Sequence, residues 1–291
     1  MDKLPRIFID GGEAEETRAA SEAMMKHFGR PLDGQTTNPT LIAKNLASRN
    51  KGKAISEEEA LGEYKRIVRE MSKIIPKGSI SIQVFANKET KAEEMLRQAR
   101  ERNMWIPNAS IKFPCVFEGL KAAGTASLEM PINITLVFSQ SQAAVVYENT
   151  RNKKYPIFIS PFVGRLDDRG ERGMDVIKNI IEMYKNGDGH VEVLTASVRN
   201  IEHILYAIYL GSDIITIPFN VLKLWADQNF PNPGEKYDYD SLIGVKKLKP
   251  IPFSRETVLG KNWQEYNLGH DLTLSGIERF YGDWIRLFDN L

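Results

Sequence analysis

The chain has 291 residues, of which 39 are Lys or Arg and 38 are Asp or Glu, so its formal charge at pH 7 is only +1. This balance argues against a nucleic-acid-binding or polybasic membrane-surface protein, and a hydrophobic content of 42% is typical of a globular one. The single cysteine, Cys115, cannot form a disulfide within the chain, and no apolar run approaches the roughly 18 residues of a membrane span. We therefore expect a cytoplasmic protein without an export signal, a membrane anchor or a nucleic-acid partner.

Short apolar runs rich in β-branched residues recur along the chain and predict buried strands. They lie at residues 6–9, 79–85, 110–113, 132–138, 157–160, 191–194 and 214–217, with a weaker candidate at 34–37. Segments with helical periodicity lie between them, at residues 14–28, 57–75, 90–104, 140–149, 171–185 and 199–210. Ser56 with Glu59, and Thr90 with Glu93, have the spacing of capping boxes at the start of two of these helices.

Eight strand segments that alternate with helices predict a (β/α)8 TIM barrel, an α/β fold whose usual length is near that of this chain. An open, doubly wound sheet is the alternative. Polar residues at or just past the strand ends favour the barrel, because barrel enzymes carry their chemistry there. These residues are Asp10, Asn38, Thr135, Ser160, Ser197 and Thr216.

The composition changes after Gln228, where Pro, Gly, Asn, Tyr and Lys become frequent. We interpret residues 228–291 as a C-terminal helical extension of a single domain that spans residues 1–291. Ser275 and Glu278 have the spacing of a cap for a last helix that runs toward Phe288. The apolar side chains of this helix need a partner, which is either the barrel itself or a neighbouring subunit of a homo-oligomer.

Several common sites are absent from the sequence. It contains no GxxxxGK[ST] phosphate loop, no GxGxxG after a strand and no HExxH, and its four histidines are scattered. Cys115 is followed by nothing that resembles a cysteine-protease sequence, so we interpret it as a buried, inert thiol. We expect no metal and no cofactor.

Lys112 interrupts an apolar strand, which would place its ammonium group in a desolvated interior. Desolvation lowers the pKa of a lysine and yields the neutral amine that attacks a carbonyl carbon to form a Schiff base. Taken alone, the spacing favours an ordinary lysine on an exposed edge, or one whose charged end reaches solvent from a strand end.

Six strings near the strand ends together resemble the transaldolase family. They are Phe8-Ile-Asp10, Thr36-Thr-Asn-Pro-Thr-Leu-Ile42, Ile111-Lys-Phe-Pro114, Ile132-Asn-Ile-Thr-Leu-Val-Phe138, Ile159-Ser-Pro-Phe-Val-Gly-Arg-Leu-Asp167 and Ala196-Ser-Val-Arg-Asn200. The resemblance extends from residue 6 to about residue 225. Any one string is weak evidence, but six in the right order are specific. The resemblance implies a class I aldolase barrel of the transaldolase and fructose-6-phosphate aldolase group, with the Schiff-base lysine at Lys112.

The resemblance also implies roles for other polar residues. Asp10 would be the acid/base at the substrate hydroxyl, although a carboxylate that faces a lysine can also be a plain buried ion pair. Asn38, Asn133 and Thr135 would hold the dihydroxyacetone unit and the catalytic water, and Ser160 would lie in the same pocket. An asparagine before a proline is also a common turn former, so Asn38 has a structural alternative.

The substrate phosphate would bind to Arg165, Ser197 and Arg199, which follow the sixth and seventh strands. Late loops and helix starts of barrels are favoured anion sites, and guanidinium groups suit phosphate. As alternatives, Arg165 could pair with the aspartates at Asp167–Asp168, and Arg199 with Glu202, in surface salt bridges that contribute little to stability.

Two positions depart from the family pattern. Gln83 stands where many transaldolases carry a glutamate that relays protons, and fructose-6-phosphate aldolases carry a glutamine there as this chain does. Phe162, in contrast, stands where those aldolases carry a tyrosine. Without that phenol, water is less readily activated. The resemblance therefore implies transfer of a dihydroxyacetone unit from sedoheptulose 7-phosphate or fructose 6-phosphate to an aldose phosphate, as in the pentose phosphate pathway. The alternatives are net aldol cleavage of fructose 6-phosphate and non-catalytic sugar-phosphate binding.

Overall fold

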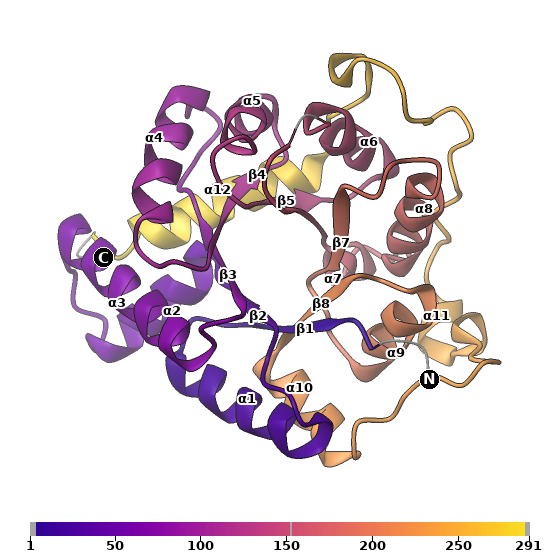
Figure 1. Cartoon of the computed structure of the whole chain (residues 1–291), viewed down its shortest axis with the longest axis horizontal. Helices are drawn as coiled ribbons and strands as arrows, with labels where there is room; N and C mark the ends of the chain where they lie inside the picture. The colour runs from indigo at the N-terminus through magenta and orange to yellow at the C-terminus, as the bar shows by residue number, and fades with distance from the viewer. Residues whose placement is uncertain (1–3, 152, 289–291) are drawn as a thin grey trace.

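The computed structural model describes residues 4–151 and 153–288. Eight parallel strands form a closed barrel in sequence order, with β8 pairing with β1 (Figure 1). The strands are β1 (Arg6–Asp10), β2 (Gly34–Thr36), β3 (Ser79–Gln83), β4 (Ala109–Pro114), β5 (Ile132–Val137), β6 (Ile157–Pro161), β7 (Val191–Thr195) and β8 (Ile214–Pro218). The predicted (β/α)8 barrel is therefore confirmed, and the open sheet is excluded.

Helices surround the barrel (Figure 1). They are α1 (Ala14–Phe28), α2 (Pro39–Arg49), α3 (Glu57–Ile74), α4 (Ala92–Asn103), α5 (Phe117–Ala126), α6 (Gln140–Asn149), α7 (Val163–Asp167), α8 (Met174–Tyr184), α9 (Ile201–Leu210), α10 (Phe219–Asp227), α11 (Ile243–Lys246) and α12 (Asp271–Ile285), with 3-10 turns η1 (Tyr239–Ser241) and η2 (Trp263–Glu265). The sequence did not predict α2, α5, α7, α10 and α11. In the described residues, no helix has the length and apolar character needed to cross a membrane.

One predicted capping box is confirmed and two caps are wrong. Ser56 and Glu59 bond reciprocally at the start of α3. The Thr90 hydroxyl instead donates to Asn87 within the preceding turn, so α4 starts two residues later, at Ala92. Ser275 lies inside α12, because that helix already begins at Asp271. Spacing alone cannot separate a cap from a serine inside a helix or a threonine in a turn.

The strands sort their side chains between the two faces of the barrel wall, because successive residues of a strand point in opposite directions. Ile7 and Ile9 of β1 belong to the large core between strands and helices. A separate, smaller cluster fills the inside of the barrel and consists of Phe8, Phe158, Leu194, Ala196 and Ile214. Asp10, Ser160 and Thr216 follow two residues after members of this cluster. The same alternation therefore directs their side chains inward, nearer the carboxyl ends of the strands.

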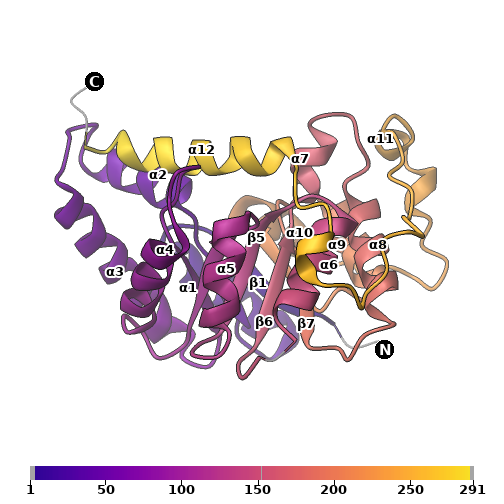
Figure 2. The same ribbon diagram turned by 90° about the horizontal axis from the view of Figure 1, so that it is seen from above.

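Helix α12 crosses one end of the barrel and packs against α2 and β5 (Figure 2). The side chains of Ile277, Phe280 and Trp284 on this helix are buried. Trp284 stacks on Phe85 with ring centroids 4.1 Å apart. The barrel of the same chain is thus a partner for the apolar face of this helix. Residues 289–291 of the predicted extension lie outside the described residues.

Candidate active site

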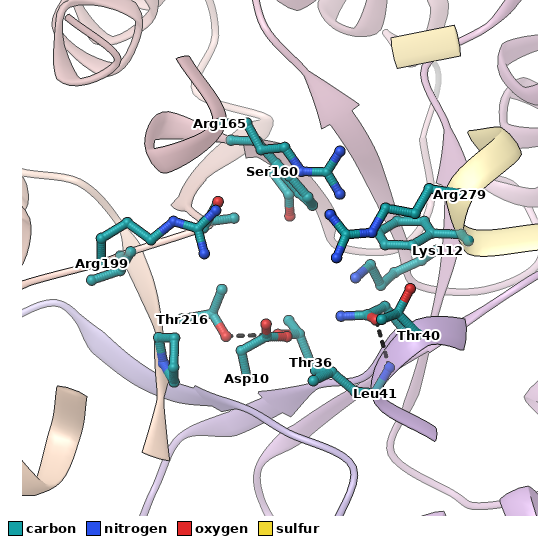
Figure 3. A pocket seen from close by; sticks show the side chains of 17 residues that line it. Asp10, Thr36, Thr40, Leu41, Lys112, Ser160, Arg165, Arg199, Thr216 and Arg279 are labelled. Atoms are coloured by element: carbon teal, nitrogen blue, oxygen red, sulfur yellow. Dashed lines mark hydrogen bonds between the residues drawn. The ribbon is translucent and has the colours of Figure 1, made fainter. Parts of the chain in front are cut away.

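A pocket of about 210 Å³ opens at the carboxyl ends of the strands (Figure 3). Its lining comes from the strand ends, the loops after them and α12. The lining residues are Asp10, Thr36, Asn38, Thr40, Leu41, Lys112, Ser160, Phe162, Arg165, Ala196, Ser197, Val198, Arg199, Thr216, Pro218, Arg279 and Phe280. Eight of the predicted site residues are among them, namely Asp10, Asn38, Lys112, Ser160, Phe162, Arg165, Ser197 and Arg199.

Lys112 lies on β4 with only 3% of its surface exposed. Its Nζ donates a hydrogen bond to the carbonyl oxygen of Thr37 at 2.9 Å. Desolvation lowers the pKa of Lys112 from 10.5 to about 8, although the negative charge of Asp10 opposes this effect. With a pKa near 8, about a tenth of the amine is neutral at pH 7. The exposed-lysine alternative is therefore wrong.

Asp10 ends β1 and is half-buried. Its Oδ1 accepts a hydrogen bond from the Thr36 hydroxyl at 2.6 Å, and the hydroxyl groups of Thr36 and Thr216 lie 2.7 Å apart. Burial raises the pKa of Asp10, while the charge of Lys112, the Thr36 hydrogen bond and the charge of Arg199 lower it. In the described part of the chain, Asp10 and Lys112 share the pocket without a direct ion pair. The carboxyl group is thus held near the amine but not neutralised by direct contact.

Asn38 has the structural function that the sequence offered as an alternative, and it also lies at the pocket. Its Oδ1 accepts from the backbone N–H of Leu41 at 3.0 Å and caps α2, whose first residue is Pro39. It also lines the pocket. A cap of this kind fixes the rotamer of the side chain, so its amide group is presented to the pocket in a defined orientation.

Asn133, Gln83 and Thr135 are buried beside the pocket rather than in its lining. Asn133 accepts from Ser160 Oγ at 2.7 Å and donates to Ser81 Oγ at 3.1 Å, so it orients the pocket serine. Gln83 and Asn133 are the neighbours of Lys112 in the sheet register. Gln83 Oε1 and Thr135 Oγ1 have no hydrogen-bond partner in the described residues. Buried polar atoms of this kind are the groups that internal water molecules bind.

Arginine side chains reach the pocket from different sides (Figure 3). Arg199 pairs with Asp168 at 3.0 Å, so the alternative partner Glu202 is wrong. Within the described residues, Arg165 has neither Asp167 nor Asp168 within ion-pair distance. Burial, together with the charges of other arginines at the pocket, lowers the pKa of Arg165. Several guanidinium groups gathered in a concave site favour the binding of an anion.

Backbone contacts around Ser197 hold Arg199 close to α7. Gly164 N–H donates to the Ser197 carbonyl at 3.0 Å, and a Cβ at Gly164 would collide with that oxygen and with the Arg199 side chain. His203 accepts from the Arg199 N–H at 3.3 Å, and its other ring nitrogen lies 2.7 Å from Asp167. The loop after β7 is therefore anchored to α7 and α9 on both sides.

Phe162 lines the pocket and packs edge-on against Phe138, with ring centroids 5.9 Å apart. It presents an apolar ring where a tyrosine would present a hydroxyl group.

Sequence reasoning did not assign a role to Thr36, Thr40, Arg279 or Phe280. Thr36 stands in one of the quoted strings at a strand end, so the sequence could have identified it as a pocket residue. Arg279 and Phe280 reach the pocket only because α12 crosses the barrel, which no local pattern reveals.

Comparisons with known proteins relate the chain to one enzyme family. The sequence profile of the family described as Transaldolase/Fructose-6-phosphate aldolase matches residues 7–291. A "Probable transaldolase" of Thermoplasma volcanium is 37% identical over 220 residues, covering 75% of this chain and 86% of the relative. One of Clostridium botulinum is 36% identical over 246 residues, covering 83% of this chain and 100% of the relative. Among solved structures, a 2,3-dimethylmalate lyase covers 77% of each chain at 12% identity, with a TM-score of 0.43; a likeness this low carries no functional information.

The fold and the family match define a (β/α)8-barrel enzyme of the transaldolase type, whose pocket contains a buried lysine, a carboxyl group and arginine side chains. The chain belongs to the transaldolase/fructose-6-phosphate aldolase family.

Proposed function

We propose that this protein is a cytoplasmic transaldolase that acts on sugar phosphates of the pentose phosphate pathway. It would transfer a dihydroxyacetone unit from sedoheptulose 7-phosphate or fructose 6-phosphate to an aldose phosphate. The observation that carries the proposal is Lys112, a buried amine with its pKa lowered to about 8, in the same pocket as the carboxyl group of Asp10, which has no ion-pair partner among the described residues.

In the first half of the reaction, the neutral amine of Lys112 adds to the ketone carbon, and the resulting carbinolamine loses water to give an iminium ion. Asp10 takes the proton from the hydroxyl group on the fourth carbon. The bond between the third and fourth carbons breaks, its electron pair moves toward the iminium nitrogen, and an aldose phosphate leaves. The three-carbon enamine stays on Lys112 until a second aldose phosphate enters and the steps run in reverse.

Asn38, Ser160 and the adjacent Asn133 suit the hydroxyl groups of the dihydroxyacetone unit, because each offers an amide or hydroxyl group at the pocket or next to it. The unpartnered oxygens of Gln83 and Thr135 would hold the water released and consumed at Lys112. Arg165, Ser197 and Arg199 would bind the phosphate.

Two side chains favour transfer over net cleavage. The amide of Gln83 cannot accept a proton from water, and the ring of Phe162 brings no hydroxyl group to the pocket. Water at the enamine is therefore poorly activated, and the three-carbon unit stays bound to Lys112 until an aldehyde acceptor binds. Fructose 6-phosphate cleavage remains the second candidate, because the family resemblance associates a glutamine at position 83 with that activity.

The test is a coupled assay for glyceraldehyde 3-phosphate released from fructose 6-phosphate, run with and without erythrose 4-phosphate. Transfer predicts product only when the acceptor is present. An aldolase releases product without an acceptor, and a non-catalytic binder releases none in either assay. Lys112→Met serves as the inactive control.

A further inference from the structure

Arg279 reaches the pocket from α12, an element outside the strand-end loops that carry the other pocket residues (Figure 3). Its side chain is 59% exposed, and the nearest carboxylate in the described residues is Asp283, with Nε and Oδ2 separated by 3.8 Å. That separation is too long for a hydrogen bond. The guanidinium group is therefore free to bind something else in the pocket.

Asp283 is already engaged by other groups. Its Oδ2 accepts from the Thr40 hydroxyl at 2.5 Å, and its Oδ1 accepts from Arg286 at 2.8 Å. The Arg286 pair offsets the charge of Asp283, and the Thr40 bond ties α12 to α2. Asp283 thus fixes the helix in place, and because it also pairs with Arg286, it offsets the charge of Arg279 only in part.

Helix α12 is also held close to the barrel at its other end. A Cβ at Gly276 would lie 2.6 Å from the end of the Leu136 side chain, so a larger residue here would require that side chain to shift. The Thr273 hydroxyl donates to the Leu136 carbonyl oxygen at 2.9 Å. Arg279 lies between these two anchors, so a rigid element positions it over the pocket.

Three guanidinium groups therefore surround one opening. In Figure 3, Arg165 and Arg279 point toward each other, and Arg199 approaches from the opposite side. The charge of Arg279 is one of the causes that lower the pKa of Arg165, after burial. In the described residues, Arg199 has an acidic partner at hydrogen-bond distance, Asp168 at 3.0 Å, whereas the nearest carboxylate to Arg279 is Asp283 at 3.8 Å. Like charges gathered in this way repel one another unless an anion lies between them.

We propose that Arg279 is a third phosphate ligand, which α12 supplies and which makes the enzyme selective for phosphorylated over free sugars. This inference rests on the proposed function and adds a specificity residue to it. The phosphate would lie between Arg165 and Arg279, with Arg199 at its far side. Guanidinium groups bind phosphate oxygens through charge-assisted hydrogen bonds, which a free hydroxyl group cannot replace.

The experiment compares Arg279→Gln with Arg169→Gln in the full-length protein. Arg169 pairs with Asp271 at the start of the same helix and does not line the pocket, so it controls for the loss of one positive charge near α12. kcat/KM is measured with erythrose 4-phosphate and with erythrose as acceptors, using fructose 6-phosphate as the common donor at saturation. Thermal unfolding checks that each variant is folded.

We expect Arg279→Gln to lower kcat/KM for erythrose 4-phosphate by about 10- to 100-fold, and that for erythrose by less than about 2-fold. Arg169→Gln should leave both values unchanged. An equal loss for both acceptors, or no loss for either, would overturn the proposal. Calorimetric binding of inorganic phosphate gives an independent readout. If the wild type transfers no carbon unit, the proposed function fails, but weaker phosphate binding by Arg279→Gln still supports the ligand role and unchanged binding refutes it.

Discussion

Replacing Lys112 by methionine should stabilise the protein at neutral pH although it removes the proposed nucleophile. Lys112 is almost fully buried, and desolvation lowers its pKa from 10.5 to about 8, against the opposing charge of Asp10. The folded pKa lies below the unfolded one, so the unfolded chain binds more protons between these two values. Wild-type stability therefore rises with pH across this window, and the cost of burying the ammonium is greatest below pH 8.

The difference between the two pKa values corresponds to about 3 kcal/mol at pH 7 and about 1 kcal/mol at pH 9.5. The stability advantage of Lys112→Met should thus shrink by about 2 kcal/mol between these pH values. Loss of the hydrogen bond to Thr37 and the packing of the new side chain add an offset that does not vary with pH. The change with pH is therefore a cleaner quantity than either stability difference alone.

Urea unfolding followed by circular dichroism at several pH values from 7 to 9.5 measures this change. Lys121→Met is the matched control, because Lys121 is an exposed lysine on α5 that pairs with Glu93 at 3.2 Å. Its effect on stability should stay within about 0.5 kcal/mol. The prediction would be refuted if the stability difference between Lys112→Met and the wild type stayed constant or grew with pH. Burial of the Lys112 ammonium would then carry no free-energy cost.

Three further predictions concern the acid/base group and the thiol. Asp10→Asn should slow carbon–carbon cleavage by about 100-fold or more while leaving Schiff-base trapping intact, as rapid-quench kinetics with borohydride can measure; equal loss of both would contradict its role. Thr36→Val removes the 2.6 Å hydrogen bond that lowers the pKa of Asp10, so the acidic limb of the kcat/KM profile should move to higher pH, and an unmoved limb would count against Asp10 as the base. Cys115 is fully buried and burial raises the pKa of its thiol, so a thiol-specific reagent should react only after denaturation, and rapid reaction of the native protein would refute this.

The barrel was predictable from the sequence because its strands carry a strong local signal. β-branched residues alternate with inward-facing residues, as in β1, where Ile7 and Ile9 flank Phe8 and precede Asp10. Strand periodicity of this kind is encoded well in local sequence. The position of Lys112 was less certain, because its spacing also suits an exposed edge, and only the resemblance to the transaldolase family favoured the barrel interior.

The missed features depend on packing between distant segments. The route of α12 across the barrel, which brings Arg279 and Phe280 to the pocket, follows from the close approach of Gly276 to β5 and the bond between Asp283 and Thr40. Neither contact has a local sequence pattern. Helix α2 does have a local pattern at its start, but that pattern is ambiguous. An Asn-Pro pair occurs both in turns and at helix caps, so the helix was missed.

The most direct test of the mechanism is to trap the intermediate on the amine. The protein is treated with sodium borohydride in the presence of fructose 6-phosphate, digested, and analysed by peptide mass spectrometry. We predict an added sugar-derived mass on the peptide that contains Lys112, and no such mass in Lys112→Met. An adduct on a different lysine, or none at all while the sugar phosphate is bound, would contradict Schiff-base chemistry at this position.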